Sequence, residues 1–185
     1  MNHPVDVRPA TSRADRERFL SLPWRIYAGD PLWVPPLLPE LRRILDPDRG
    51  PFFRHGEAEL FLAWRSGRVM GRICAAEDAG SNRDNDRREC IFGFFECIPD
   101  FDVAHALLDR AAEWARHRGL NRLVGPFNLD YEDAYGVLVE GRDRPPALLC
   151  GHSPPYYAGF LERYGLGPFR GDNLAFAAPL DEQIG

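Results

Sequence analysis

Two acidic residues, Asp100 and Asp102, lie where an apolar stretch at 91–98 meets an amphipathic stretch at 102–118. A junction between a strand and a helix is a common place to bind phosphate, because the free N–H groups of the first helical turn point outward and the helix dipole favours an anion. Aspartate at such positions stabilises the helix start by about 0.3–1 kcal/mol per residue. The same charges repel a phosphate, so the sequence predicts weak binding of a phosphorylated ligand here, or none.

Further polar side chains stand at the two ends of the long Gly- and Pro-rich segment 131–155. His152, Tyr156 and Tyr157 are at its end, where a hydroxyl or an imidazole is placed to bind a substrate or to act as a general acid. Asn128 and Asp133 are near its start and add polar contacts in the same region. Packing with one hydrogen bond is the alternative interpretation of the tyrosine pair.

The four cysteines, Cys74, Cys90, Cys97 and Cys150, show neither a C-x-x-C spacing nor a C-x-x-H spacing with a partner. We therefore predict free thiols and no metal site. Cys74 and Cys97 lie in apolar strand patterns, where cysteine behaves as a small hydrophobic residue. A cysteine hydrolase that uses Cys97 or Cys150 with His152 is a remote alternative without a local motif to support it.

Charge and hydropathy exclude several classes of partner. All 23 basic residues are arginines, the net charge is −5, and both signs of charge alternate along the chain. This pattern argues against a basic stripe for nucleic acid. No apolar run approaches the roughly 20 residues that a membrane span needs, and the N-terminus lacks the apolar core of a secretory signal. We expect a cytoplasmic protein that acts on a small molecule, without nucleic acid or membrane as partner.

The first half of the sequence predicts a strand, two helices and a hairpin. The opening residues 5–11 alternate like a strand, and a helix capped at Thr11 or Ser12 follows to about residue 30, with Pro23 expected to break or kink it. A short helix with an apolar face should follow a proline-rich lead-in; we assign to this face Trp33, Val34, Leu37, Leu38, Leu41 and Leu45. Two apolar runs, joined by Ser66 and Gly67, then predict a β-hairpin.

The second half predicts a strand, a helix and a further strand. A polar loop at 79–88 leads into a strand at 89–98, in which Gly93 indicates a bulge or a close backbone approach. A helix from Asp102 to about Arg118 should end at Gly119, and a strand at 121–129 should follow. The long segment either carries function or contains a small hairpin around 136–141. We also expect a helix at 155–165 and a last strand at 172–180. The fold class is therefore α/β (α+β), with a mixed, twisted sheet flanked by helices.

This order of elements resembles the GNAT superfamily of acyl-CoA N-acyltransferases. "ALLDRAAEWARHRGL" is similar to the helix after the cofactor loop of that superfamily, and "FLERYGL" is similar to its final helix. More closely, "PWRIYAGDPLWVPPL", "PFFRHGEAELFLAWRSGRVMGRI", "GFFE", "GPFN" and "PPYY" resemble a poorly characterised bacterial GNAT-like family of longer, two-half proteins. The resemblance implies a single GNAT-like domain over residues 1–185, forming the N-terminal half of a tandem protein whose other half, or a second copy, is a partner.

The resemblance also implies site residues. It suggests Glu96 as the base that takes a proton from an amine through water, unless Glu96 faces solvent or pairs with an arginine. Because the family's acid tyrosine falls at Leu161, we take Tyr157 as the catalytic tyrosine. The loop that holds acetyl-CoA or another acyl-CoA maps to 99–104, where only Ala104 fits the family pattern. The implied cofactor-binding residues are Phe95, Cys97, Asp102, Val103 and Ala104.

Two functions follow as alternatives from the resemblance. One is an acyltransferase domain with a degenerate cofactor loop, which transfers an acyl group from acyl-CoA to an amine. The other is a non-catalytic GNAT-like module that binds a small molecule or packs against a second half. Aspartate at the junction favours the module, whereas glycine and arginine there would favour the enzyme.

Overall fold

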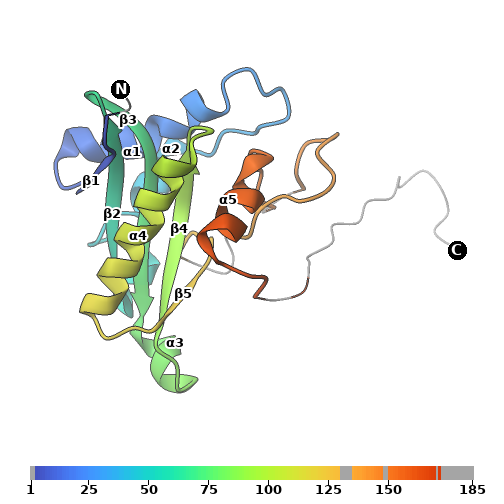
Figure 1. The fold of residues 1–185 in the computed structure, drawn as a ribbon. Coiled ribbons are helices and arrows are strands. Elements are labelled where there is room, and N and C mark those ends of the chain that lie inside the picture. Colours follow the sequence, from blue (N-terminus) through green and yellow to red (C-terminus); the bar gives the residue numbers. More distant parts are fainter. Residues whose placement is uncertain (1–2, 130–134, 148–149, 170, 172–185) are drawn as a thin grey trace, which may run out of the picture.

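The computed structural model describes residues 3–129, 135–147, 150–169 and 171, and its central feature is a mixed β-sheet. Five strands lie in sequence order within this part of the chain (Figure 1). The first four pair antiparallel, and the last pairs parallel to its neighbour. They are β1 Asp6–Pro9, β2 Gly56–Arg65, β3 Arg68–Asp78, β4 Glu89–Cys97 and β5 Arg122–Val124. The predicted mixed sheet is therefore confirmed.

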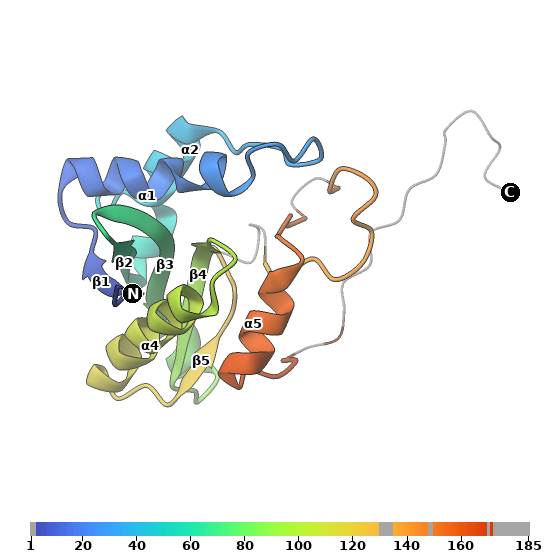
Figure 2. The same cartoon turned by 45° about the horizontal axis from the view of Figure 1, so that its top comes forward.

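Helices cover both faces of this sheet. Figure 2 shows α1 and α2 on one face, α4 on the other, and α5 beside the edge that β4 and β5 form. A separate apolar cluster fills each of the two layers. The helices are α1 Arg13–Ile26, α2 Leu38–Ile44, α3 Ala79–Asp84, α4 Phe101–His117 and α5 Tyr156–Tyr164, with a 3₁₀ turn η1 at Pro51–Arg54.

The helix α4 forms as its sequence predicts. Asp100 caps it, since its side chain accepts the N–H of Asp102, and Gly119 ends it with a left-handed φ of +73°. Its apolar stripe is buried against the sheet, with Val103, Ala104, Leu107, Leu108 and Ala111 fully inaccessible to solvent. The chain thus passes from β4 to β5 over one face of the sheet, which is the strand–helix–strand crossover that the sequence indicates.

The predicted hairpin is also present. Strands β2 and β3 pair along almost their whole length, and the turn residues Ser66 and Gly67 both have positive φ, 50° and 74°. A two-residue turn with this geometry matches the twist of the strands that it joins.

Several predictions about the first half are wrong. Pro23 does not break the first helix, since α1 continues through it to Ile26, and the proline leaves Phe19 O without the usual hydrogen bond from residue 23. The apolar face assigned to the second helix is not buried throughout, since Val34 and Leu37 are 63% and 77% exposed. The polar loop at 79–88 contains α3, which Asp78 caps by accepting the N–H of Ser81.

In the second half, the strand predicted at 121–129 is shorter than expected. Its pairing with β4 ends at Val124, and one more backbone hydrogen bond joins Phe127 N–H to Phe92 O. No strand forms at 136–141; just before this range, Tyr135 forms an isolated antiparallel bridge with Phe127. The strand predicted at 172–180 and the candidate Asp133 lie outside the described residues.

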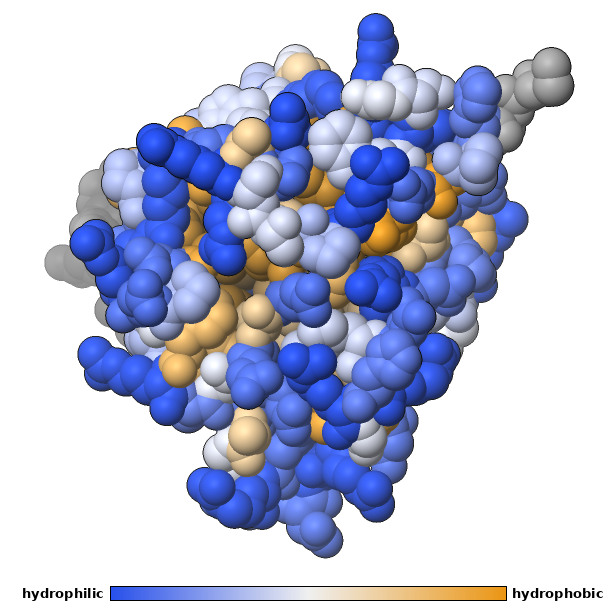
Figure 3. All heavy atoms as spheres, turned by 90° about the vertical axis from the view of Figure 1, so that its left-hand side faces the viewer, coloured by the Kyte–Doolittle hydropathy of each residue, from blue (hydrophilic) through white to orange (hydrophobic). Residues whose placement is uncertain are grey.

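The surface carries charges of both signs. On the side of the molecule that carries β1, hydrophilic residues cover most of the surface and hydrophobic ones show mainly between them (Figure 3). Many arginines pair with nearby carboxylates, as Arg42 does with Glu17 and Arg43 with Glu40. No helix of the described residues is both long enough and apolar enough to cross a membrane.

Candidate functional site

A β-bulge in β4 sets the direction of Glu96. The register between β3 and β4 shifts between Arg72 and Cys74, so that one extra residue is accommodated on β4, where Phe94 has a positive φ of 48°. As a result Phe92 and Phe95 belong to the cluster under α4, whereas Phe94 belongs to the cluster under α1. Side chains of a regular strand alternate between faces, so without the extra residue Glu96 would share the α4 face with Phe92.

Two contacts hold the bulge. An added Cβ on Gly93 would lie 1.6 Å from Phe127 O, so only glycine allows this close approach and the predicted role of Gly93 is confirmed. The N–H of Phe94 donates to Asn128 Oδ1 over 2.8 Å. Asn128, predicted to bind a substrate, therefore already uses its amide oxygen to satisfy the backbone of the bulge.

Glu96 faces a buried arginine on the neighbouring strand. Arg72 is its direct partner in the register, with Nη2 3.9 Å from Glu96 Oε1, and the two side chains are 5% and 14% exposed. Arg72 Nη1 also donates to Phe19 O over 2.7 Å. This carbonyl is available because Pro23, four residues later in α1, has no N–H to offer it. The proline in the helix thus leaves an acceptor that anchors Arg72 beside Glu96.

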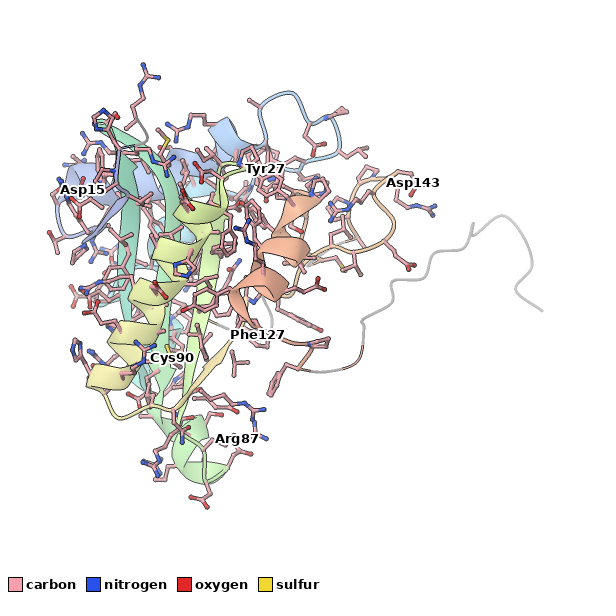
Figure 4. All side chains as sticks on the ribbon, viewed as in Figure 1. Asp15, Tyr27, Arg87, Cys90, Phe127 and Asp143 are labelled. Carbon is pink, nitrogen blue, oxygen red and sulfur yellow. The ribbon has the colours of Figure 1, made fainter. Side chains whose placement is uncertain are left out.

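Two tyrosine hydroxyls complete the surroundings of Glu96. Tyr157 donates to Glu96 Oε2 over 2.7 Å, and Tyr27 shares its hydroxyl between Glu96 Oε1 at 3.3 Å and His152 O at 3.1 Å. Burial raises the pKa of Glu96, and the charge of Arg72 together with the two hydroxyls opposes this rise. Burial and the nearby carboxylate raise the pKa of both tyrosines, so they stay protonated donors. Figure 4 shows Tyr27 at the end of the sheet where α4 begins.

Helix α5 occupies the free edge of β4 beyond the point where β5 leaves it. The N–H of Cys97 donates to the Tyr157 hydroxyl over 2.8 Å, and the Tyr156 hydroxyl donates to Cys97 O over 2.8 Å. These hydroxyls take hydrogen-bonding positions that a neighbouring strand would otherwise fill. Both tyrosines therefore have packing and hydrogen-bonding roles in addition to the contact of Tyr157 with Glu96.

The N-terminus of α4 contains an anion of the chain itself. Asp100 Oδ1 accepts the N–H of Asp102 over 2.9 Å, and the N–H groups of Val103 and Ala104 bond to Asp100 O. The other carboxylate oxygen of Asp100 pairs with Arg65, whose side chain is 11% exposed. The N–H groups that would hold a pyrophosphate are thus largely used within the helix, and the charge of Asp100 is balanced by an arginine.

A histidine and an aspartate lie next to the Glu96 network. His152 Nε2 is 2.7 Å from Asp30 Oδ2, and Asp30 Oδ1 accepts the N–H of Leu32 over 2.9 Å. The hydrogen bond from His152 is the main cause that lowers the pKa of Asp30. The other ring nitrogen, Nδ1, is buried and has no hydrogen-bond partner among the described residues. The Tyr27 hydroxyl links this pair to Glu96 through the carbonyl of His152.

The thiols and the possible metal ligands do not form a site. Cys74, Cys90 and Cys97 are buried, which raises the pKa of each, that of Cys90 to about 12, whereas Cys150 is exposed. A thiol with a raised pKa is a poor nucleophile at neutral pH. Among the residues that the structure describes, no group of three His, Cys, Asp or Glu is placed to hold a metal ion.

The residues predicted to bind the cofactor flank the junction between β4 and α4. Phe95, Cys97, Val103 and Ala104 have side chains buried in the cluster under α4. Asp102 lies in the first turn of α4 with its N–H held by Asp100. The structure therefore brings Glu96, Tyr157, Tyr156 and His152 together, and it gives the residues of the loop at 99–104 a role in starting the helix.

Sequence reasoning missed three residues of the site: Tyr27, Asp30 and Arg72. Arg72 could have been found, because it and Glu96 are single charges inside apolar runs of strands that pair antiparallel, and a buried charge needs a partner. Tyr27 and Asp30 have no comparable local signal. Tyr27 meets Glu96 across 69 residues of sequence, and Asp30 meets His152 across 122 residues.

Comparison with curated proteins finds longer relatives, while no family model matches the chain. A bacterial ceramide synthase from Caulobacter vibrioides is 40% identical over 165 residues, which make up 89% of this chain and 43% of that protein. Protein YghO from Escherichia coli is 31% identical over 159 residues, 86% of this chain and 40% of that protein. The chain thus spans about two fifths of the length of the curated relatives it matches.

Comparison with solved structures finds acetyltransferases. A putative acetyl transferase from Pyrococcus furiosus aligns over 95% of this chain and 99% of that chain, with a TM-score of 0.51 and 16% identity. An aminoglycoside acetyltransferase from an uncultured soil sample, in complex with sisomicin, aligns over 95% of both chains, with a TM-score of 0.56 and 7% identity. A tandem GNAT protein from the clavulanic acid pathway aligns over 87% of this chain and 43% of that chain, with a TM-score of 0.53 and 18% identity. These TM-scores show that the chain shares its fold with the three structures.

Proposed function

We propose that this chain, which has the GNAT fold, is the N-terminal half of a longer N-acyltransferase and that it binds and deprotonates an amine acceptor. The tandem GNAT structure and the two longer curated relatives support the two-half arrangement. A ceramide is the amide of a long-chain amino alcohol, so the relative of that name supports amide formation on a lipid-like amine.

The observation that carries the proposal is the environment of Glu96. A general base must have a pKa nearer to the working pH than an ordinary carboxylate has, and burial shifts the pKa of Glu96 in that direction. Arg72 and the two tyrosine hydroxyls fix the orientation of the carboxylate. The side chain of Glu96 is 14% exposed, and we propose that a water molecule or an amine approaches it through this exposed part.

Exposed apolar side chains near this network suit an acceptor with a hydrocarbon chain. The Tyr27 ring stacks on Trp33 with 4.9 Å between centroids, and Trp33 meets the edge of Trp24 at 5.4 Å. Trp24 is 36% exposed, and Val34 and Leu37 on the same connection are more exposed still. We propose that the hydrocarbon chain of the acceptor lies along these residues, with its amino group at Glu96.

The residues at the start of α4 do not fit the pyrophosphate of an acyl-CoA. The N–H groups of Asp102, Val103 and Ala104 are used by Asp100, and the carboxylate of Asp100 lies where a phosphate would have to be. We therefore propose that the start of α4 does not hold the pyrophosphate of an acyl-CoA. The same observation favours the second candidate function, a non-catalytic module that binds the acceptor and packs against another half.

The proposal is tested with an acyl donor that lacks a pyrophosphate. The chain is incubated with a long-chain amine and an acyl thioester of N-acetylcysteamine, and the amide is measured by mass spectrometry. We expect amide formation by the wild type and a loss of about 10²–10⁴-fold in Glu96→Gln. Equal rates in both proteins would exclude Glu96 as the base, and amine binding without any turnover would select the module.

Calorimetry with acetyl-CoA tests the pyrophosphate separately. We expect no measurable binding to the wild type, because Asp100 and a phosphate would compete for the same N–H groups. The Asp100 carboxylate also repels a phosphate: two like charges a few ångströms apart repel by about 1–4 kcal/mol, and the pairing of Asp100 with Arg65 reduces this repulsion. Micromolar binding by the wild type would show that the helix start opens for the cofactor, and binding only by Asp100→Gly/Asp102→Gly would show that these two side chains close it.

A further inference from the structure

We propose that a hollow beside the first half of α1 binds a small organic carboxylate with an apolar body, at a site separate from Glu96. The hollow lies between α1, the end of α2 and β2, and its volume of about 330 Å³ is within the range of small-ligand sites. Tyr27, which contacts Glu96, follows the other end of α1. At a rise of 1.5 Å per residue, the backbones of Arg16 and Tyr27 are roughly 16 Å apart.

The hollow has an apolar base and a charged rim. One face of α1 supplies four of its lining residues at a spacing of three or four: Arg13, Arg16, Glu17 and Leu20. Leu45 after α2 and Leu60 in β2 complete the base, and all three leucines belong to the cluster under α1. Figure 3 views the side of the molecule that carries β1 and the start of α1, where hydrophobic surface shows between hydrophilic side chains. Such a hollow suits a ligand with an apolar body and one charged group.

The acidic residues of the hollow already have partners. Glu17 accepts from Arg42 Nε over 3.1 Å and from Arg42 Nη2 over 2.9 Å. Asp46 accepts the N–H of Asp48 over 3.0 Å and is 3.8 Å from Arg49 Nε. A cationic ligand would therefore compete with an arginine for either carboxylate.

Two arginines of the rim retain donors for an anion. Arg16 gives Nη1 to Leu45 O over 3.3 Å, and a guanidinium has five N–H groups in all. No hydrogen bond or ion pair joins Arg13 to another described residue. Its charge only adds to the hydrogen bond and the charge of Arg42 in lowering the pKa of Glu17. Because a planar guanidinium matches the two oxygens of a carboxylate, the charge that the rim favours is a carboxylate beside Arg13 and Arg16.

Calorimetry on the wild-type chain tests the chemical class of the ligand. The probe is 4-phenylbutyrate, and 4-phenylbutanamide and 4-phenylbutylamine are matched controls that keep the phenylpropyl body with no charge or a positive one. We expect one site per chain with a dissociation constant of about 1 mM or below for the carboxylate, and at least about tenfold weaker binding of both controls. Added salt should weaken only the carboxylate. No binding of 4-phenylbutyrate, or equal binding of all three compounds, would overturn the proposal.

Nuclear Overhauser effects locate the probe on the wild-type chain. We expect contacts between the ring protons of 4-phenylbutyrate and the methyl groups of Leu20, Leu45 and Leu60, which form the base of the hollow. Contacts with the indole of Trp33 instead would place the probe near Glu96 and would overturn the separate site. This result does not depend on the folding of any variant.

Variants then test the rim. Arg13→Gln/Arg16→Gln should bind 4-phenylbutyrate at least about tenfold more weakly. The control Arg18→Gln lies on the same helix but outside the hollow, where Arg18 pairs with Asp15 and lies over Trp64, and it should bind as the wild type does. Equal losses in both variants, or none in either, would overturn the role of the rim. Glu96→Gln should also bind normally, so this site stands or falls independently of the proposed function.

Discussion

The pairing of Arg72 with Glu96 makes a prediction that depends on pH. Replacing Arg72 with methionine keeps a long side chain between the Phe19 and Phe94 rings, which Arg72 now contacts at 4.9 and 5.8 Å, but it removes the positive charge. Glu96 must then remain charged without its partner or take up a proton. A pair at this distance attracts with about 4 kcal/mol at an effective dielectric of 20, so protonation becomes the less costly response as the pH falls.

The free energy needed to protonate Glu96 sets an upper limit on the stability that Arg72→Met loses through the unpaired carboxylate. The unperturbed pKa of a glutamate is 4.5, and each pH unit above the pKa costs about 1.4 kcal/mol, so protonation costs at most about 3.4 kcal/mol at pH 7 and about 0.7 kcal/mol at pH 5. The unpaired Phe19 O adds about 1 kcal/mol at either pH. We expect Arg72→Met to lose about 3–4 kcal/mol at pH 7 and about 1–2 kcal/mol at pH 5.

The sign follows from the raised pKa of Glu96. A carboxyl whose pKa is higher in the folded state contributes most stability below its unfolded pKa of 4.5, and this stability is lost as the pH rises through the folded pKa. Removing Arg72 raises the folded pKa further, so the gap between wild type and variant widens from pH 5 to pH 7. Urea unfolding at both pH values measures it, with Glu96→Gln as the background in which the pH dependence should vanish. An equal loss at both pH values, or in both backgrounds, would refute the pairing.

Two further predictions concern the bulge in β4. Gly93→Ala should destabilise the protein by more than about 3 kcal/mol or prevent folding, because the new methyl group would meet Phe127 O at 1.6 Å. The control Gly159→Ala in α5, where a Cβ would meet nothing within 4 Å, should be neutral or stabilise by up to about 1 kcal/mol. Thermal unfolding compares the two variants, and similar losses of stability would contradict the close approach. Asn128→Ala should lose about 1–3 kcal/mol in urea unfolding because it leaves the Phe94 N–H unpaired, while Asn85→Ala on the surface should lose less than about 0.5 kcal/mol; equal effects would mean that Asn128 does not hold the bulge.

The sequence predicts the elements whose signals are local. Two apolar runs joined by Ser66-Gly67 give the hairpin, and the apolar stripe before Gly119 gives α4, because in both cases the pattern and the turn residue indicate the same structure. Gly93 is predicted as a close approach for the same reason. Predictions fail where packing overrides the pattern, as at Val34 and Leu37, which remain exposed although their spacing suits a buried face.

The candidate site could be predicted only in part. Glu96, Tyr157, Tyr156 and His152 are named by residue type and resemblance, and the structure brings them together. Their partners come from distant segments, and the face on which Glu96 lies depends on one extra residue near Phe94, which a period of two cannot anticipate. A regular alternation of side chains would place Phe92 and Glu96 on the same face of the sheet.

The two ends of this network differ in how they affect stability, and the difference indicates where function lies. At the start of α4, Asp100 satisfies the N–H of Asp102 and is balanced by Arg65, so this junction is stable without a ligand. At the other end, burial raises the pKa of Glu96, which costs folding free energy at neutral pH. Such costs persist in proteins mainly where a ligand or a reaction uses them. We therefore propose that the chemistry of this half is at Glu96 and that Asp100 has a structural role at the start of α4.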